Sequence, residues 1–242
     1  MYEEYVNKLK EACRKKRWKV KEICCVGKNK EYKIFCIANN PLKYTKTVCF
    51  LAGMHGDEIG GPFAIVKFIE KFDAKKFGRL KIIIIIPVGN PSGFDKGKRR
   101  NYLNKDLNGH FCGRTLFEEN KIIYNAVKNK KIFFVHVLHE DIDEARFYLY
   151  NFEKNEEEIY KNIIKMASNH VKINKDKEIY GNKSKNGIIK NRKDCSFEDR
   201  LFRDGTPFSM CTESPGKLPL AKRVDLNVKV MNFVLKFALR YN

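Results

Sequence analysis

The stretch VCFLAGMHGDEIGG, residues 48–61, decides the fold predicted for this chain. An apolar run ends at Gly53, and small residues after Glu58 open a segment with helical spacing, so the stretch predicts a strand, a turn and a helix. The turn carries His55 and Glu58 at the strand end, where open α/β sheets build their ligand sites. An imidazole and a carboxylate at this spacing suit Zn²⁺, although the same spacing also occurs in exposed polar loops.

Length and composition predict a single α/β domain over residues 1–242. Hydrophobic residues make up 43% and aromatic residues 12% of the chain, which is enough for a buried core. The formal net charge of +20 is spread along the sequence, and the basic runs are short, such as residues 14–17 and 98–100. We therefore interpret the charge as a lysine-rich solvated surface and do not expect nucleic acid as a partner.

The eight cysteines contain no Cys-x-x-Cys pair, and Cys36 and Cys49 lie within apolar, strand-like runs. Residues 1–20 are amphipathic and charged, without the apolar centre of a signal peptide. The longest apolar run, residues 82–88, is too short to span a bilayer. These features favour a soluble, cytoplasmic setting with free thiols and no membrane partner.

Strand and helix patterns alternate along the chain. Strands are predicted at residues 18–26, 33–38, 47–52, 80–88, 132–138, 147–152 and 207–212. Helices are predicted at residues 2–16, 58–72, 115–128, 153–171 and 218–240. This order predicts an α/β fold with a mixed, mostly parallel central sheet flanked by helices.

Two polar segments lack useful periodicity. Residues 89–113 are dense in Gly, Asn, Pro and charge, and long loops of this kind inside compact domains are usually functional. Residues 172–204 are polar and lysine-rich. For this second segment two interpretations stay open, an ordered lid and a mobile excursion.

Ionisable residues follow three of the predicted strands. His55 and Glu58 follow the first, His139 ends the strand at 132–138, and Glu213 ends the strand at 207–212. Parallel strands end at the same edge of a sheet, so these side chains are expected to converge there. Two histidines and one glutamate give a three-ligand Zn²⁺ site with an open position for water, and a further carboxylate can serve as general base. That arrangement predicts a hydrolase.

Four stretches then resemble the zinc carboxypeptidase family, the funnelin-type metallocarboxypeptidases, together with their succinylglutamate desuccinylase-like and murein-peptide amidase-like members. They occur in the family's order: AGMHGDE at 52–58, NPSGF at 90–94 followed by RRNYLNKDLN at 99–108, VLHED at 137–141, and CTESPG at 211–216. The resemblance implies the zinc carboxypeptidase/phosphorylase-hydrolase-like fold.

The resemblance also implies roles for individual residues. It makes His55, Glu58 and His139 the ligands of one zinc ion, and it places Glu213 on the family's catalytic glutamate. Arg99 falls where the family keeps the arginine that binds substrate and stabilises the developing oxyanion.

The sequence departs from the family after Asp-Leu-Asn. The family continues with an arginine that grips the substrate's terminal carboxylate together with the preceding asparagine, but Gly109 and His110 follow Asn108 here. Asn108 keeps its predicted substrate-binding role, whereas a glycine cannot replace a bidentate guanidinium. Other cations that could compensate are His110, Arg100, Arg114, Arg146 and Arg203.

Tyrosine is often used by the family near the scissile bond, on a mobile loop. Tyr180, in the polar segment, is the nearest candidate for this substrate-binding role. Tyr148 and Tyr150 follow VLHED closely and are predicted to be core strand residues.

Other polar residues have simpler interpretations. His136 alternates with valines inside a strand, which predicts a packed or hydrogen-bonded core histidine, and His170 is predicted to be exposed. Glu140 and Asp141 either orient His139 as hydrogen-bond acceptors or cap the next segment.

The sequence therefore predicts a zinc-dependent hydrolase that cleaves an amide bond in a small peptide. An N-acyl amino acid deacylase of the succinylglutamate desuccinylase type is the alternative within the enzymes, and a murein-peptide amidase competes as well. A non-catalytic binding protein that uses its positive surface is the alternative from another class. The substrate side chain, the need for a free C-terminal carboxylate and the oligomeric state stay open.

Overall fold

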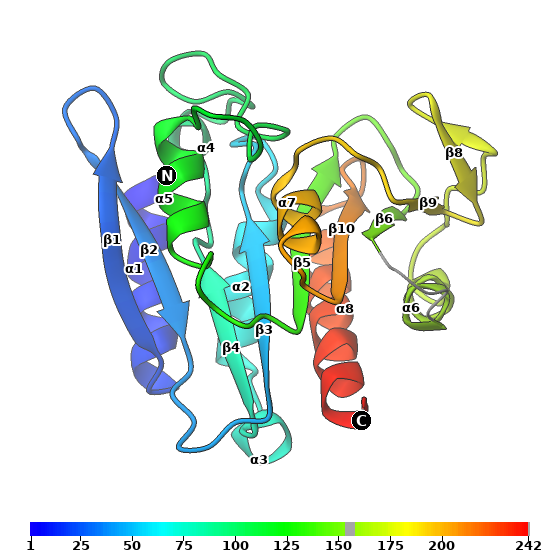
Figure 1. The fold of residues 1–242 in the computed structure, drawn as a ribbon, viewed down its shortest axis with the longest axis horizontal. Coiled ribbons are helices and arrows are strands. Elements are labelled where there is room, and N and C mark those ends of the chain that lie inside the picture. The colour runs from blue at the N-terminus through cyan, green and yellow to red at the C-terminus, as the bar shows by residue number, and fades with distance from the viewer. Residues whose placement is uncertain (153–157, 242) are drawn as a thin grey trace.

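A ten-stranded sheet runs across the molecule in the order β1-β2-β4-β3-β5-β10-β6-β9-β8-β7 (Figure 1). The computed structural model describes residues 1–152 and 158–241. The strands are β1 (Lys19–Val26), β2 (Tyr32–Ala38), β3 (Lys46–Ala52), β4 (Leu80–Ile85), β5 (Phe134–Asp141), β6 (Tyr148–Phe152), β7 (Glu178–Ile179), β8 (Asn182–Lys185), β9 (Ile188–Lys190) and β10 (Phe208–Pro215). The helices are α1 (Tyr2–Lys15), α2 (Gly60–Glu70), α3 (Ala74–Phe77), α4 (Pro91–Lys96), α5 (Glu118–Asn125), α6 (Glu158–Ser168), α7 (Phe197–Arg203) and α8 (Leu220–Arg240).

The strands at the middle of the sheet run parallel. β3 pairs parallel with both β4 and β5, and β5 pairs parallel with β10. Nearly every residue of β3 and β5 is buried, as expected for strands covered by helices on both faces. Towards the edges, β2 joins β4 and β6 joins β10 in antiparallel pairs. The predicted mixed sheet flanked by helices is confirmed, with most of its parallel pairing at the centre.

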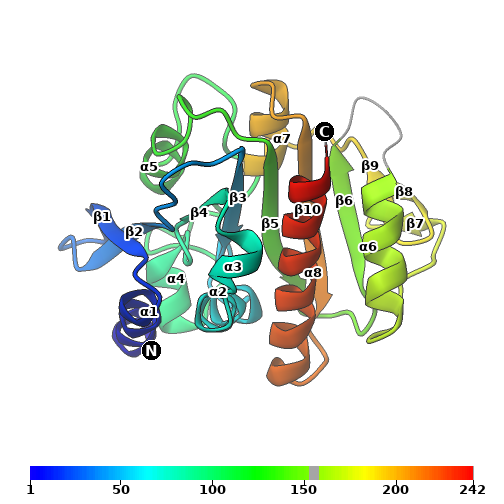
Figure 2. The same cartoon turned by 90° about the horizontal axis from the view of Figure 1, so that it is seen from below.

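Helices cover both faces of this sheet. α1, α2 and α8 lie on one face, and α5 and α7 lie on the other (Figure 1; Figure 2). Side chains alternate along β5, so Phe134 and Leu138 enter the core shared with α2 and α8, whereas Val135 and Val137 enter the core shared with α5 and α7. Burial of a side chain of this kind contributes about 1.5–3 kcal/mol relative to exposure. Two cores thus support the strand ends from both sides.

Most predicted elements are present, with ends shifted by a few residues. β1 and β2, which correspond to the first two predicted strands, pair as an antiparallel hairpin. The predicted helix at 153–171 lies partly on residues 153–157, which are outside the described residues, and the remainder forms α6. In the described part of the chain, no helix is both long and apolar enough to cross a membrane.

Helix α4 is a difference from the prediction, which placed no regular structure in residues 89–113. The side chain of Asn90 accepts a hydrogen bond from the Gly93 amide at 2.9 Å, and Pro91 occupies the first position of the helix. Gly97 then ends the helix in the left-handed conformation, with φ of +60°. Capping residues specify this short helix, so hydrophobic periodicity could not reveal it.

Residues 172–204 are also structured. β9 pairs parallel with β6 and antiparallel with β8, which extends the sheet beyond β10. α7 begins after Ser196, whose side chain accepts from the Asp199 amide at 3.3 Å. α7 packs over the face that carries Val137 and Cys211. This segment therefore covers the sheet beside the expected site.

Candidate metal centre

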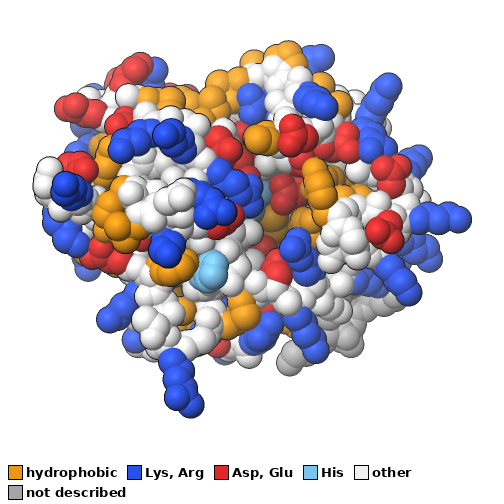
Figure 3. Space-filling model, turned by 90° about the horizontal axis from the view of Figure 1, so that it is seen from above, with side chains coloured by type: hydrophobic (Ala, Val, Ile, Leu, Met, Phe, Trp, Pro, Cys, Tyr) orange, Lys and Arg blue, Asp and Glu red, His pale blue; other side chains and the backbone are white. Residues whose placement is uncertain are grey.

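Four ionisable side chains meet at the edge where the parallel strands end. His55 and Glu58 lie in the turn between β3 and α2. His139 lies near the C-terminal end of β5. Glu213 in β10 is the register partner of His139. Viewed from above this edge, lysine and arginine side chains surround a hollow in which acidic side chains lie deeper (Figure 3). The structure thus brings these sequence-predicted residues together.

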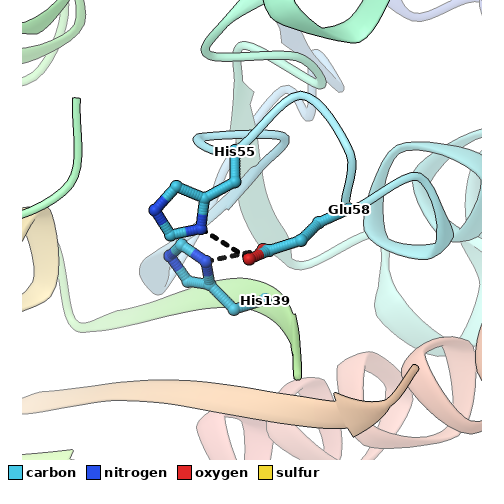
Figure 4. A group of neighbouring side chains, drawn as sticks. All are labelled: His55, Glu58 and His139. Atoms are coloured by element: carbon cyan, nitrogen blue, oxygen red, sulfur yellow. Dashed lines mark hydrogen bonds and ion pairs between the residues drawn. The ribbon is translucent and has the colours of Figure 1, made fainter. Parts of the chain in front are cut away.

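The two imidazoles point at the same carboxylate (Figure 4). Nδ1 of His55 lies 2.5 Å from Oε1 of Glu58, and Nδ1 of His139 lies 2.7 Å from Oε2. All three residues are at most 3% exposed. Two imidazole nitrogens and a carboxylate that converge in this way form a donor set that could hold a metal ion, and one that suits Zn²⁺.

Glycines allow the turn that carries His55 and Glu58 to pack closely. A Cβ added at Gly56 would lie 2.0 Å from the carbonyl carbon of Gly93 in α4. A Cβ added at Gly60 would lie 2.1 Å from Oε1 of Glu140. The glycines of the HGDEIGG pattern therefore let this turn pack closely against α4 and Glu140, in addition to the roles of its ionisable side chains.

Strong electrostatic coupling links the three buried groups. Burial lowers the pKa of the His55 imidazole, but the carboxylates of Glu58 and Asp106 outweigh burial and raise it to about 9. Burial raises the pKa of Glu58, but the two histidines hold it well below its usual range. A metal ion needs deprotonated ligands, so it would take the place of the protons that these pairs share.

Asp106 is a site residue without a role predicted from the sequence. Its Oδ1 lies 3.2 Å from Nε2 of His55, and its Oδ2 accepts from Nε of Arg99 at 3.0 Å. The backbone amide of Asn108 donates to the same Oδ1 at 3.0 Å. A carboxylate on the far nitrogen of a ligating histidine fixes the ring and its tautomer. The sequence feature that could have indicated this role is the position of Asp106 in the Asp-Leu-Asn motif.

Arg99 lies beside the same cluster. Its Nη1 is 3.7 Å from Oε1 of Glu58, while Asp106 holds its Nε. Its side chain is half exposed. Asp106 therefore fixes the guanidinium at Nε, while part of the side chain stays exposed to a substrate.

Glu140 lies on the opposite side of β5 from His139. Its carboxylate accepts from the Gly60 amide at 2.8 Å and from Arg223 of α8 at 2.7 Å. Its backbone amide donates to Oε2 of Glu58 at 3.1 Å. These contacts match neither predicted role, because the carboxylate accepts at the N-terminus of α2, an earlier helix, rather than from His139 or the next segment, and Arg223 supplies the balancing charge.

Glu213 occupies the face of the sheet that also carries His139. Burial raises the pKa of the Glu213 carboxyl, the His139 charge opposes the rise and Glu58 adds to it, and the pKa reaches about 8. Its Oε1 accepts from the thiol of Cys211 at 3.8 Å. A carboxyl with a pKa near neutrality can both accept and deliver a proton in working conditions.

Tyr180 and Gly109 lie outside the buried group of His55, Glu58 and His139. Gly109 has a φ of +75°, and a Cβ there would lie 3.1 Å from the carbonyl oxygen of Asp194. Tyr180 is 68% exposed, and its hydroxyl donates to Oδ1 of Asp141 at 3.2 Å. Tyr148 donates to the other oxygen of Asp141 at 2.8 Å and is buried in β6, as predicted. Tyr180 is therefore at the site's mouth, near the end of β5.

Several of the compensating cations proposed from the sequence are engaged elsewhere. Arg146 pairs with Glu144 and Asp176, and Arg203 pairs with Asp199. His110 is exposed and its ring lies 4.7 Å from that of Phe117. Arg100 donates to the carbonyl of Asn104 at 3.1 Å.

Two further histidines match their predictions. His136 is fully buried, and its Nε2 lies 2.8 Å from the hydroxyl of Thr212, so it is a hydrogen-bonded core residue. His170 is exposed, with Lys229 beside its ring. Neither histidine contributes to the group at His139.

A second cluster of potential ligands comprises Cys112, Cys195 and Asp199. The carboxylate of Asp199 already accepts from the amides of Asp194 and Cys195, at 3.1 and 2.8 Å, and from Arg203 at 2.5 Å. These contacts satisfy the carboxylate and place a positive charge beside it. The cluster is therefore a poor cation site.

Comparisons with known proteins agree with this arrangement. The family model of the succinylglutamate desuccinylase/aspartoacylase catalytic domain matches residues 44–149, which include His55, Glu58 and His139. A search among curated proteins finds no match.

Solved structures share the fold. A proposed metallopeptidase from Shewanella amazonensis has a TM-score of 0.89 at 24% identity, covering 96% of this chain and 91% of that one. A metallo-carboxypeptidase from Burkholderia cenocepacia has a TM-score of 0.79 at 15% identity, covering 99% and 69%. A succinylglutamate desuccinylase/aspartoacylase from Rhodobacter sphaeroides has a TM-score of 0.61 at 14% identity, covering 90% and 64%. With the family model, they confirm the resemblance to zinc carboxypeptidases and their succinylglutamate desuccinylase relatives.

Proposed function

We propose, with that resemblance as the premise, that this chain is a zinc-dependent hydrolase that cleaves an amide bond in a small peptide. The observation that carries the proposal is the convergence of two Nδ1 atoms on the carboxylate of Glu58, with Glu213 on the adjacent strand. Three buried ligands and a nearby carboxyl of raised pKa are the parts that metal-assisted hydrolysis needs.

His55, Glu58 and His139 would hold the zinc ion. When bound, Zn²⁺ lowers the pKa of water and polarises a carbonyl group. Asp106 keeps the His55 ring oriented through Nε2, and burial excludes competing solvent from the ligands.

Glu213 is proposed as the general base. It would take a proton from the attacking water and deliver it to the leaving amine; burial raises the pKa of this carboxyl, and the charge of a bound Zn²⁺ would oppose the rise. Arg99, held at Nε by Asp106, places its Nη atoms beside the cluster to stabilise negative charge on the former carbonyl oxygen. Asn108 and Tyr180 would position the substrate from the rim.

An N-acyl amino acid deacylase is the second candidate. The match of residues 44–149 to a desuccinylase/aspartoacylase catalytic domain favours it, whereas the similarity to the Burkholderia cenocepacia and Rhodobacter sphaeroides structures, at 15% and 14% identity, is one of fold and favours neither reaction. Both reactions hydrolyse an amide next to an amino acid, so the same residues serve either one.

The test combines metal analysis with hydrolysis of N-acylated dipeptide and N-acyl amino acid libraries. Wild type is expected to hold one zinc ion and to lose hydrolysis when a chelator removes it. Glu213→Gln should lower kcat/KM by about 1,000-fold, within the range for a general base, while zinc content and Tm stay unchanged. The matched control is Glu70→Gln, on the exposed end of α2.

Unchanged hydrolysis in Glu213→Gln, with zinc bound, would overturn the assignment of the base. A metal-free wild type with no activity on either library would favour the non-catalytic binding protein instead.

A further inference from the structure

The segment between β9 and α7, residues 191–195, lies against the turn at Gly109. The backbone amide of Phe111 donates to the carbonyl of Cys195 at 2.8 Å. The carbonyl oxygen of Asp194 is within 3.1 Å of the place a Gly109 side chain would begin. Residues 191–195 therefore occupy the space beside the position where the sequence lacks a guanidinium.

Arg192 belongs to this segment and has an ordered setting. Its guanidinium carbon lies 5.3 Å from the ring centre of Tyr150, and its Nε lies 3.3 Å from Oδ2 of Asp194. The other oxygen of Asp194 accepts from the Ser196 amide at 3.0 Å, which fixes the carboxylate. Stacking and the ion pair thus hold the guanidinium plane through one face and through Nε.

The terminal nitrogens of Arg192 are left for another partner. The side chain is 41% exposed, and among the described residues neither Nη1 nor Nη2 makes a hydrogen bond. An arginine edge with two free parallel donors matches a carboxylate in bidentate geometry. A fixed, partly exposed edge of this kind is suited to binding a carboxylate of a ligand.

The register places Tyr150, the ring under this guanidinium, on the face of the sheet that carries the proposed base. Tyr150 pairs with Cys211 across the β6–β10 ladder, and Tyr148 pairs with Glu213 two residues further along. Alternate residues share a face, so Tyr150 and Glu213 lie on the same face of the sheet. Burial raises the pKa of Tyr150, and the nearby charge of Glu213 adds to the rise while that of Arg192 opposes it.

We propose that Arg192 binds a carboxylate of the substrate next to the scissile amide, in place of the guanidinium absent at position 109. The inference rests on the proposed hydrolysis and narrows its substrate class to amides whose leaving amino acid has a free carboxylate. The carboxylate would bridge Nη1 and Nη2 of Arg192, with Asn108 on the neighbouring turn. Arg192 is then a binding residue that determines specificity.

The test uses one N-acetylated dipeptide library in two forms, with free and with amidated C-termini, on the zinc-loaded protein. Wild type is expected to prefer the free acids. Arg192→Gln should lower kcat/KM for free acids by about 10- to 100-fold, as for loss of a charge-assisted hydrogen bond, mostly through KM. Hydrolysis of the amides should change by less than about threefold, because no charge is recognised there.

Two variants separate binding geometry from net charge. Arg192→Lys should recover only part of the preference, because an ammonium cannot form the bidentate pair. Lys193→Gln removes the same charge from the adjacent exposed position and should leave both rates unchanged. Calorimetric binding of the two libraries to Glu213→Gln protein measures affinity without turnover, and free acids should bind more tightly only when Arg192 is present.

The possible failures are distinguishable. If wild type hydrolyses both forms equally, or Arg192→Gln slows both equally with an unchanged Tm, the assignment of Arg192 is wrong and the hydrolase proposal stands. If wild type hydrolyses neither form, the proposed function fails, and equal binding of the two forms to the Glu213→Gln protein would then also reject the carboxylate site.

Discussion

The proposed metal end and the proposed substrate end of this site are built differently. At the metal end, His55, Glu58 and His139 are buried and joined to one another by direct contacts. At the substrate end, Arg192 and Tyr180 are exposed, lie on connecting segments and make few contacts each. Binding residues on loops can change while the strands and helices below them stay constant.

This difference indicates which property each end determines. A tightly connected metal end keeps the catalytic geometry constant, because moving one ligand disturbs the others. A rim built from connecting segments would allow the substrate carboxylate to be held from residue 109 in one protein and from another segment in the next. Substitutions should therefore have large effects on chemistry at one end and graded effects on selectivity at the other.

His139→Ala should have the largest effect. Losing a residue that hydrogen-bonds to a metal ligand typically weakens metal binding by about 10- to 100-fold. Removing a ligand itself should cost more, so we expect zinc binding to weaken by more than about 100-fold. Elemental analysis after dialysis should find no zinc, and hydrolysis should be lost with it. His170→Ala, at an exposed histidine, should keep one zinc ion per chain. Retained zinc in His139→Ala would break the proposed contrast between the two ends.

Asp106→Asn should have the next largest effect. The substitution keeps the size of the side chain but removes the charge that orients His55 at Nε2. Zinc affinity, measured by competition with a chromophoric chelator, should fall by about 10- to 100-fold. Asp225→Asn, which removes an exposed carboxylate from α8, is the matched control. Equal affinities for both variants would show that Asp106 does not support the metal end.

His136 tests how the core below the metal end responds to acid. Burial lowers its pKa from 6.5 to about 3, so between these values the unfolded chain binds a proton that the folded chain does not. Its contribution to stability is complete above pH 6.5 and declines as the pH falls. The loss at pH 5 is about 2 kcal/mol.

His136→Gln should therefore reduce the difference in unfolding free energy between pH 8 and pH 5 by about 2 kcal/mol, measured with urea. The amide nitrogen of glutamine can replace Nε2 beside Thr212. His170→Gln should leave the difference unchanged, because that histidine is exposed in both states. A pH dependence that persists in His136→Gln would contradict the role given to burial.

Tyr180→Phe should have the smallest effect. It removes only the hydroxyl that contacts Asp141, and KM should rise by about two- to fivefold, as expected for one hydrogen bond at an exposed position. Zinc content should stay unchanged, since the contact does not involve a ligand. A loss of zinc would show that the rim and the metal end are coupled, against the comparison above.

The metal end could be predicted from the sequence because local pattern encodes it. His55 and Glu58 follow an apolar run, and His139 ends another, so alternation and strand direction suffice to bring them together. The fold class followed from the same alternation of strands and helices.

The supporting contacts could not be predicted in this way. Glu140 meets Arg223 across 83 residues of sequence, and this contact depends on which face of β5 a side chain occupies and where α8 packs. Arg192 lies in a polar segment without periodicity, and its position beside the site follows from the pairing of β9 with β6. Short-range patterns carry no information on either arrangement.

The contact between Glu140 and Arg223 also bears on when a metal can be taken up during synthesis. The amide of Glu140 holds Glu58, and Arg223 balances the charge of Glu140 from within α8. A growing chain has left the ribosome with His55, Glu58 and His139 well before β10 and α8 emerge. We therefore expect a nascent chain to bind zinc poorly until α8 docks, so that unfinished chains neither sequester the ion nor begin hydrolysis.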